Sequence, residues 1–119
     1  MNSNDFDKEI RSQQAKIGPP ALGVERRVMQ ICANSPVPSG WIKIDDDWSP
    51  TSCGNPSGIT YNLWTIETYS DKSIDAVMEV CAGAPTPTGW VEVDRFWSPT
   101  RCGHPQSITR NIKTIRRVS

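Results

Sequence analysis

The chain contains the same sequence pattern twice. Residues 28–69 and 77–118 align without a gap at an offset of 49 residues, and 21 of the 42 aligned positions are identical. Each copy contains, in this order, V-M-x-x-C-A, P-x-P-x-G-W, D-x-x-W-S-P-T-x-C-G-x-P and I-T-x-N-x-x-T-I. An internal repeat indicates one supersecondary unit used twice, so we expect both copies to adopt the same local structure.

The length of the repeat limits how the chain can fold. A unit of about 42 residues is close to the smallest size that supports a hydrophobic core without a partner or a covalent link. We therefore predict one structural unit with pseudo-two-fold symmetry, in which both copies enclose one interior. It comprises repeat 1 (28–69), a connector (70–76) and repeat 2 (77–119). Residues 1–27 are expected to form a mostly flexible tail.

Apolar and polar residues alternate in two segments of each copy, which predicts β-strands. In the second segment, Ile42 and Ile44 are expected to point inward, and so are Val91 and Val93. The P-x-P-x-G turn between the segments favours a rigid, extended reversal of the chain. The four segments are Val28–Cys32, Trp41–Asp45, Val77–Cys81 and Trp90–Asp94.

The last segment of each copy is ambiguous. Residues 63–69 are rich in threonine, isoleucine and aromatic residues, which favours a strand. Ile59, Leu63 and Ile66 nevertheless have helical spacing. We predict a third strand, with a bulge near Asn62 and Asn111. The expected fold is then all-β, a small sandwich or partly closed barrel, and the alternative is an α+β fold with a short helix ending each repeat.

The four cysteines follow the repeat. Cys32 and Cys53 are 21 residues apart, and Cys81 and Cys102 have the same spacing. Of the three connectivities that four cysteines allow, symmetry favours one disulfide in each copy. Free buried thiols and a zinc site are the alternatives, although the close C-x-x-C pairs of most structural zinc sites are absent. Paired cysteines point to an oxidising or extracellular setting, while residues 1–20 show no signal peptide.

Charge is distributed unequally although the chain is neutral. Repeat 1 has one lysine and four acidic residues, a net charge of −3, whereas repeat 2 has six basic and three acidic residues, a net of +3. Opposite faces can attract within one molecule or between molecules. Nucleic-acid binding is not expected, because repeat 1 would repel phosphate. The predicted basic surface comprises Arg110, Lys113, Arg116 and Arg117.

Aromatic residues are the candidates for ligand contact. A position that holds Trp64 in one copy and Lys113 in the other is expected to be exposed, because lysine is rarely buried. The same argument predicts that Tyr61 is exposed, because its counterpart is Arg110. Trp48 and Trp97 recur in the loops, either as framework or as two equivalent platforms. The predicted ligand-binding residues are Asp45, Trp48, Tyr61, Asn62, Trp64, Asp94, Trp97 and Asn111.

The sequence does not indicate an enzyme. Its one histidine, His104, corresponds to Asn55 and lies in a C-G-H-P turn. No cofactor motif and no repeated metal site is present, since Asp45–Asp47 corresponds to Asp94–Phe96. No apolar run approaches the ~20 residues that cross a bilayer. We therefore predict a non-enzymatic binding module with a glycan or protein partner and carbohydrate as the first ligand class. The alternative is an assembly subunit, a homo-oligomer for example, that uses the acidic and basic repeats.

Overall fold

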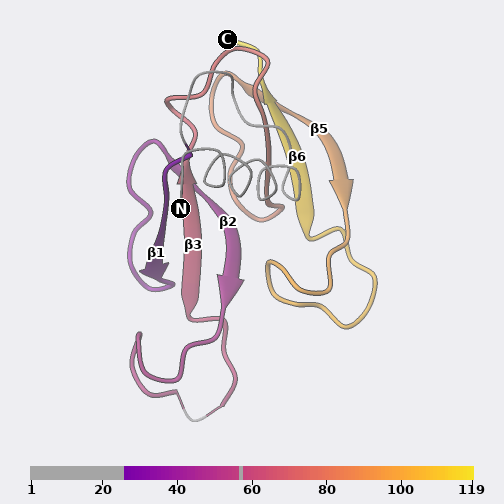
Figure 1. Ribbon diagram of the computed structural model, residues 1–119. Coiled ribbons are helices and arrows are strands. Elements are labelled where there is room, and N and C mark those ends of the chain that lie inside the picture. The colour runs from indigo at the N-terminus through magenta and orange to yellow at the C-terminus, as the bar shows by residue number, and fades with distance from the viewer. Residues whose placement is uncertain (1–25, 57) are drawn as a thin grey trace, which may run out of the picture.

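The computed structural model describes residues 26–56 and 58–119. Within these residues the fold is all-β, and it consists of two three-stranded antiparallel sheets with no helix (Figure 1). None of the described residues forms a helix that could span a membrane. The predicted tail, apart from Arg26 and Arg27, lies outside the described residues. The strands are β1 (Val28–Cys32), β2 (Trp41–Asp47), β3 (Leu63–Thr68), β4 (Val77–Cys81), β5 (Trp90–Phe96) and β6 (Ile112–Arg117).

The last strand of each half lies in the centre of its sheet, with strand orders β1-β3-β2 and β4-β6-β5. This position explains why its isoleucines are fully buried; the exposed fraction is 0% for Ile66, Ile112 and Ile115. The strand prediction for residues 63–69 is therefore confirmed and the helical alternative is wrong. The bulges, however, lie between Lys43 and Asp45 and between Glu92 and Asp94, not near Asn62 and Asn111.

The two sheets have corresponding registers. Val28 pairs with Glu67 in the first sheet, and Val77 pairs with Arg116 in the second. Each sheet also carries one disulfide between the end of its first strand and the long loop after its second strand. The bridges are Cys32–Cys53 and Cys81–Cys102, each with a Cα–Cα distance of 5.5 Å, and among the described residues no cysteine is free.

The sheets meet through β2 and β4. Ile42 of β2 packs against Met78 and Val80 of β4, together with Trp90 and Ile115. Both prolines of each P-x-P-x-G turn lie outside the strands, so the turn leaves the pairing of β1 and β2 with β3 undisturbed. The described residues form no closed barrel.

The expected pseudo-two-fold packing is not what the structure shows. Under a two-fold axis, corresponding residues would have equal environments, yet Ile42 is 3% exposed and its counterpart Val91 is 41% exposed. Met78 is 5% exposed, whereas its counterpart Met29 is 37% exposed. The reason is that the first sheet contributes its second strand to the contact and the second sheet contributes its first strand. The prediction that Val91 and Val93 point inward is therefore wrong.

The connector is held by buried charges. Lys72 is 5% exposed, and its ammonium lies 2.9 Å from the Glu67 carboxylate, which also binds Arg26. Arg117, at the end of β6, donates to the main-chain oxygen of Lys72, and the Asp75 amide donates to the Arg117 oxygen at 2.8 Å. Residues 70–76 are thus fixed to both sheets.

Candidate ligand-binding cleft

A cleft of about 680 Å³ lies between the two sheets. Its first wall comes from β2, β3 and the first proline turn, and its second wall from the proline turn of the second half. Residues of three kinds line it: aromatic, charged or polar, and rigid apolar. They include Trp41, Trp64 and Tyr69, then Lys43, Asp46 and Asn111, and finally Pro38, Pro85 and Pro87.

The alternation of β2 places its polar and apolar residues on opposite sides. Ile42 is buried in the core and also borders the cleft, and its neighbours Trp41 and Lys43 are half-buried and line the cleft. The Lys43 ammonium lies 3.0 Å from Asp46 Oδ2 and 4.2 Å from the centroid of the Trp64 ring. Trp64 is therefore half-buried beneath a cation–π contact rather than freely exposed.

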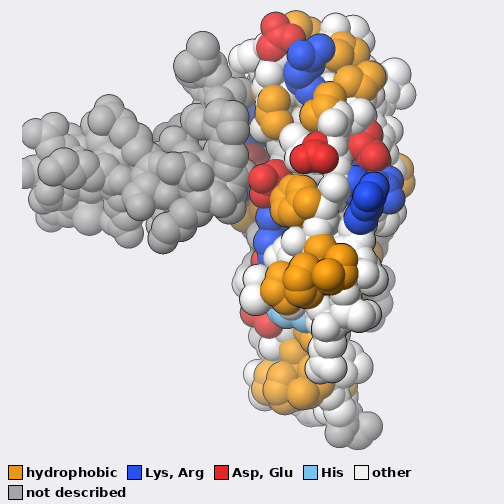
Figure 2. All heavy atoms as spheres, turned by 90° about the vertical axis from the view of Figure 1, so that its right-hand side faces the viewer, with side chains coloured by type: hydrophobic (Ala, Val, Ile, Leu, Met, Phe, Trp, Pro, Cys, Tyr) orange, Lys and Arg blue, Asp and Glu red, His pale blue; other side chains and the backbone are white. Residues whose placement is uncertain are grey.

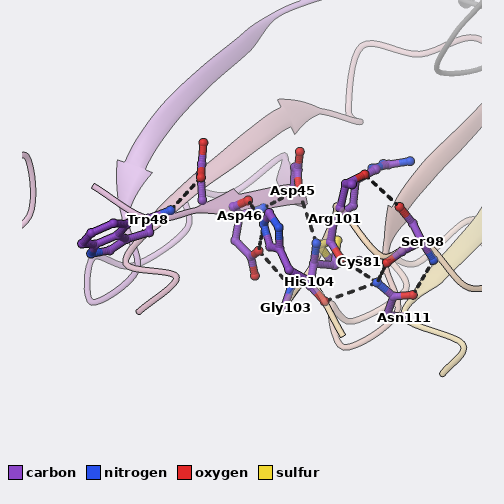
Figure 3. A network of polar contacts seen from close by, with 12 residues as sticks. Asp45, Asp46, Trp48, Cys81, Ser98, Arg101, Gly103, His104 and Asn111 are labelled. Carbon is purple, nitrogen blue, oxygen red and sulfur yellow. Dashed lines mark hydrogen bonds and ion pairs between the residues drawn. A yellow bond between two sulfur atoms is a disulfide. The ribbon is translucent and has the colours of Figure 1, made fainter. Parts of the chain in front are cut away.

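The base of the cleft is a loop of the second half docked onto β2. Cys102, Gly103 and His104 have consecutive positive φ angles of 50°, 97° and 47°. This conformation directs two successive amides toward the acidic end of β2. Here the Cys102 amide donates to Asp45 Oδ1 at 3.3 Å and the Gly103 amide to Asp46 Oδ1 at 2.8 Å (Figure 3). The acidic end of β2 thus binds the second half through its carboxylates.

The same loop provides two further contacts between the sheets. Arg101 donates to the main-chain oxygen of Ile44 in the first sheet at 3.0 Å, and it also donates to Glu79 Oε1 of its own sheet at 2.9 Å. His104 stacks on Tyr61 with ring centroids 4.3 Å apart, and its Nε2 lies 2.9 Å from the main-chain oxygen of Asp46. Sequence reasoning missed this role of Arg101 and His104. The available signal was that both differ from their counterparts in repeat 1, where the sequence has a serine and an asparagine.

Asn62 and Asn111 brace the loops that follow β2 and β5. The Asn62 side chain accepts from the Ser49 amide and donates to the Ser49 oxygen, both at 2.8 Å. Asn111 makes the same pair of bonds to Ser98 and also donates to the Arg101 oxygen at 2.6 Å. Of the two asparagines, Asn111 also lines the cleft.

The other predicted ligand-binding residues lie outside the cleft. Trp48 is 38% exposed and points away from the polar network (Figure 3). Trp97 is half-buried, and its indole N–H donates to the Pro105 oxygen at 3.4 Å. Asp94 is exposed and accepts from the Arg95 amide. The structure therefore brings Trp64 and Asn111 together in the cleft, with Asp45 and Tyr61 in the adjoining contact between the sheets.

Lys113 does not belong to a basic surface. It is 4% exposed, and its ammonium binds the Ala84 oxygen and, at 2.9 Å, Thr86 Oγ1. Burial lowers the pKa of Lys113, and the nearby Glu92 carboxylate opposes this shift. The comparison with Trp64 failed because this position lies beside the proline turn in both halves, where a hydrogen-bonded ammonium and an indole both fit. Arg110 and Arg116 are exposed, and Arg117 is half-buried.

Asp45, Asp46 and His104 are close enough to hold a metal ion, with ligand atoms within 4.8 Å of one another. Their oxygens already bind donors, however. Asp46 accepts from Lys43 and Gly103, and Asp45 accepts from the Cys102 amide. This arrangement is typical of carboxylates that accept hydrogen bonds within the fold.

The chain was compared with protein families, curated proteins and solved structures, and none of them matches it.

Proposed function

We propose that the chain is a non-enzymatic binding module that holds a carbohydrate in the cleft between its two sheets. The observation that carries this proposal is the convergence of Trp41 and Trp64 with Lys43, Asp46 and Asn111 in one cavity. Indole rings pack against the apolar C–H faces of sugar rings and lose little conformational entropy on binding. The Lys43 ammonium and the Asp46 carboxylate beside them can bind hydroxyl groups with the hydrogen-bonding capacity that their contacts with each other and with Gly103 leave free.

The cleft is also rigid. Prolines stand in both turns that flank it, and the 101–104 loop is fixed by the Cys81–Cys102 disulfide. The Asn111 side chain is hydrogen-bonded to the Ser98 amide and to the main-chain oxygens of Ser98, Arg101 and Cys102. A preformed site needs little ordering when its ligand binds, which favours affinity for a small polar ligand.

We further propose that the two halves are two copies of one module that have acquired different roles. The first copy contributes both tryptophans of the cleft, and the second copy contributes prolines, Asn111 and the 101–104 loop. A single site per chain follows from this division, in place of two equivalent platforms at Trp48 and Trp97.

The one histidine supports a non-enzymatic role. His104 stacks on Tyr61 and contacts the Asp46 main chain, so it joins the two sheets. A general base must reach the proton that it abstracts and must itself be oriented for that step. His104 Nε2 lies 2.9 Å from the Asp46 main-chain oxygen and 3.4 Å from Asp46 Oδ1, so this nitrogen is engaged in the contact between the sheets.

Tryptophan fluorescence titration against a panel of neutral and acidic oligosaccharides tests the proposal. We expect saturable quenching by at least one sugar, at one site per chain. Trp64→Ala should weaken binding about tenfold or more, because it removes an aromatic contact worth more than ~1 kcal/mol. Trp64→Phe should retain most of the affinity.

Trp48→Ala is the matched control, because Trp48 is a solvent-exposed tryptophan outside the cleft. Its affinity should equal that of the unmodified protein. Equal losses in Trp48→Ala and Trp64→Ala, or the absence of quenching by every sugar, would contradict a carbohydrate site in the cleft.

Assembly through the acidic and basic repeats is the alternative proposal. Several of the charges behind it act inside the molecule: Asp45 and Asp46 accept from the 101–104 loop, and Arg101 binds Glu79. Arg110 and Arg116 remain exposed. Self-association that strengthens at low salt, without any response to sugars, would favour this alternative.

A further inference from the structure

We propose that the chain self-associates head to tail, with β5 of one copy packing on β1 of the next. This contact would repeat, between molecules, the contact that joins β2 to β4 within the molecule. The occupant of each exposed face is thus a second copy of this chain. The inference is independent of the carbohydrate proposal, because it is based on the burial of corresponding residues.

The first observation concerns the face that would be inserted. Within the molecule, this face belongs to the first half, and its apolar residues are Ile42, Ile44 and Tyr69, all packed at the core. Their counterparts at the offset of 49 residues are exposed: Val91 at 41%, Val93 at 53% and Val118 at 43%. The second half therefore carries a valine at each of the three corresponding positions, and all three valines are exposed.

Figure 2 views the molecule from the side on which β5 lies in Figure 1. Hydrophobic side chains gather there in patches, with acidic and basic side chains between them. Large exposed apolar patches on a folded protein mark contact surfaces. Isolated apolar residues need no such explanation, but here three corresponding positions are exposed together.

The second observation concerns the face that would receive the insertion. Within the molecule, Met78 and Val80 of β4 receive β2, and they are 5% and 0% exposed. Their counterparts on β1 are Met29, which is 37% exposed, and Ile31, which is half-buried. The first half thus presents its receiving face while the second half presents its inserting face.

Together these faces define a heterologous contact. Each copy binds one neighbour through β5 and a second neighbour through β1. The assembly therefore grows unless the rotation between successive copies closes a ring. A contact that follows a two-fold axis would instead bring β5 against β5 or β1 against β1. The contact within the molecule joins unlike strands, β2 and β4, and its continuation does the same.

The polar part of the contact is only partly repeated. Asp94 keeps the carboxylate that Asp45 offers to the Cys102 amide, but Cys53 does not share the positive φ of Cys102. Arg95, however, replaces Asp46, the carboxylate that accepts from the Gly103 amide. Ser52 likewise replaces Arg101, which removes the guanidinium that donates across the contact to the Ile44 main-chain oxygen. A mostly apolar contact with few polar bonds predicts weak, reversible association.

Sedimentation velocity over a wide range of protein concentrations, without any sugar, tests the proposal. The weight-average mass should rise above the 13.2 kDa of the monomer as concentration increases. The double substitution Val91→Asp with Val93→Asp should abolish the rise by charging the inserting face, and Met29→Asp should abolish it by charging the receiving face. All three residues are exposed, so the variants should keep their melting temperatures.

Mixing the two variants distinguishes a head-to-tail contact from a symmetric one. The β5 variant retains its receiving face and the Met29 variant retains its inserting face, so the mixture should form a one-to-one dimer that grows no further. Ile108→Asp, at a residue 79% exposed and outside both faces, is the matched control and should associate like the unmodified chain.

Three outcomes would overturn the proposal. The first is a monomer at every concentration, which would leave the two faces to a partner of another kind. The second is continued self-association of either charged variant, and the third is a mixture that stays monomeric. None of these outcomes affects the sugar titration, so the two proposals can fail separately.

Discussion

Lys113 is buried because the proline turn beside it offers two oxygen acceptors. The Ala84 main-chain oxygen and the Thr86 hydroxyl both bind its ammonium, which compensates part of the cost of removing the charge from water. Trp64 occupies the corresponding position in the first half, where an ammonium is supplied by Lys43 from the neighbouring strand. Both halves therefore place a cation beside the turn, from different strands.

The lowered pKa of Lys113 predicts a pH dependence of stability. The folded protein binds this proton less tightly than the unfolded chain does, so the penalty for burying the charge is complete below the folded-state pKa. This penalty disappears as pH rises from the folded-state pKa of Lys113 to the ordinary lysine pKa of 10.5. The free energy of unfolding should therefore increase over this interval relative to that of Lys113→Met, in which the titrating group is absent.

Urea denaturation of both proteins at a series of alkaline pH values measures this difference. Subtracting the two curves removes the contribution of the other titrating groups. Lys43→Met serves as the control substitution. Lys43 is also a lysine below the surface, but it is half-buried and its ammonium forms an ion pair with Asp46. If the difference in free energy of unfolding between the unmodified protein and Lys113→Met stays flat or decreases with pH, the lowered pKa of Lys113 is contradicted.

At the scale of elements, each disulfide fixes the long loop that follows the second strand of its sheet, but the two loops have different tasks. The 101–104 loop has positive φ at Cys102 and His104, and it binds Asp45 and Asp46 of the other sheet. In the first half, among the described residues, only Gly54 of the corresponding loop has a positive φ. The covalent framework is repeated, whereas the conformation that it supports is not.

We expect the two disulfides to contribute unequally. Replacing Cys32 and Cys53 by alanine should lower the free energy of unfolding by roughly 3 kcal/mol, the chain-entropy value for a loop of this size. Replacing Cys81 and Cys102 should cost more, because it also releases the loop that joins the sheets. Thermal and urea unfolding of both double variants measures the two losses, and equal losses would contradict a special role for the second bridge.

At the scale of the whole molecule, the contact between β2 and β4 decides which residues form the core. It buries Ile42 and Met78 and leaves Val91 and Met29 in solvent. If copies also associate head to tail, their clefts are arrayed along the assembly. Such an array would gain avidity for a ligand with repeating units.

Alanine substitution at corresponding positions tests this unequal burial. Ile42→Ala should lower the free energy of unfolding by about 3 kcal/mol, because it leaves a cavity in the core. Val91→Ala should cost less than about 1 kcal/mol, since Val91 is 41% exposed and lies outside the core. Urea denaturation at a concentration where the protein is monomeric measures both, and similar losses would show that the two positions share one environment.

Local sequence determined the strands, the turns and the cysteine pairs of this protein. Alternation of apolar residues, paired prolines and equal cysteine spacing act over a few residues or within one copy, so they operate whatever the rest of the chain does. The third strand was predictable for the same reason, although its bulge was placed in the wrong strand. Among the site residues, local patterns indicated Trp64 and Asn111.

Only the tertiary structure decided which of two similar faces is buried. Ile42 and Val91 have similar side chains and follow the same P-x-P-x-G-W motif, and their environments differ because the sheets dock through unlike strands. The cleft, the burial of Lys113 and the linking role of His104 follow from that docking. A repeated sequence specifies equal units, and the physical contact between the units makes them different.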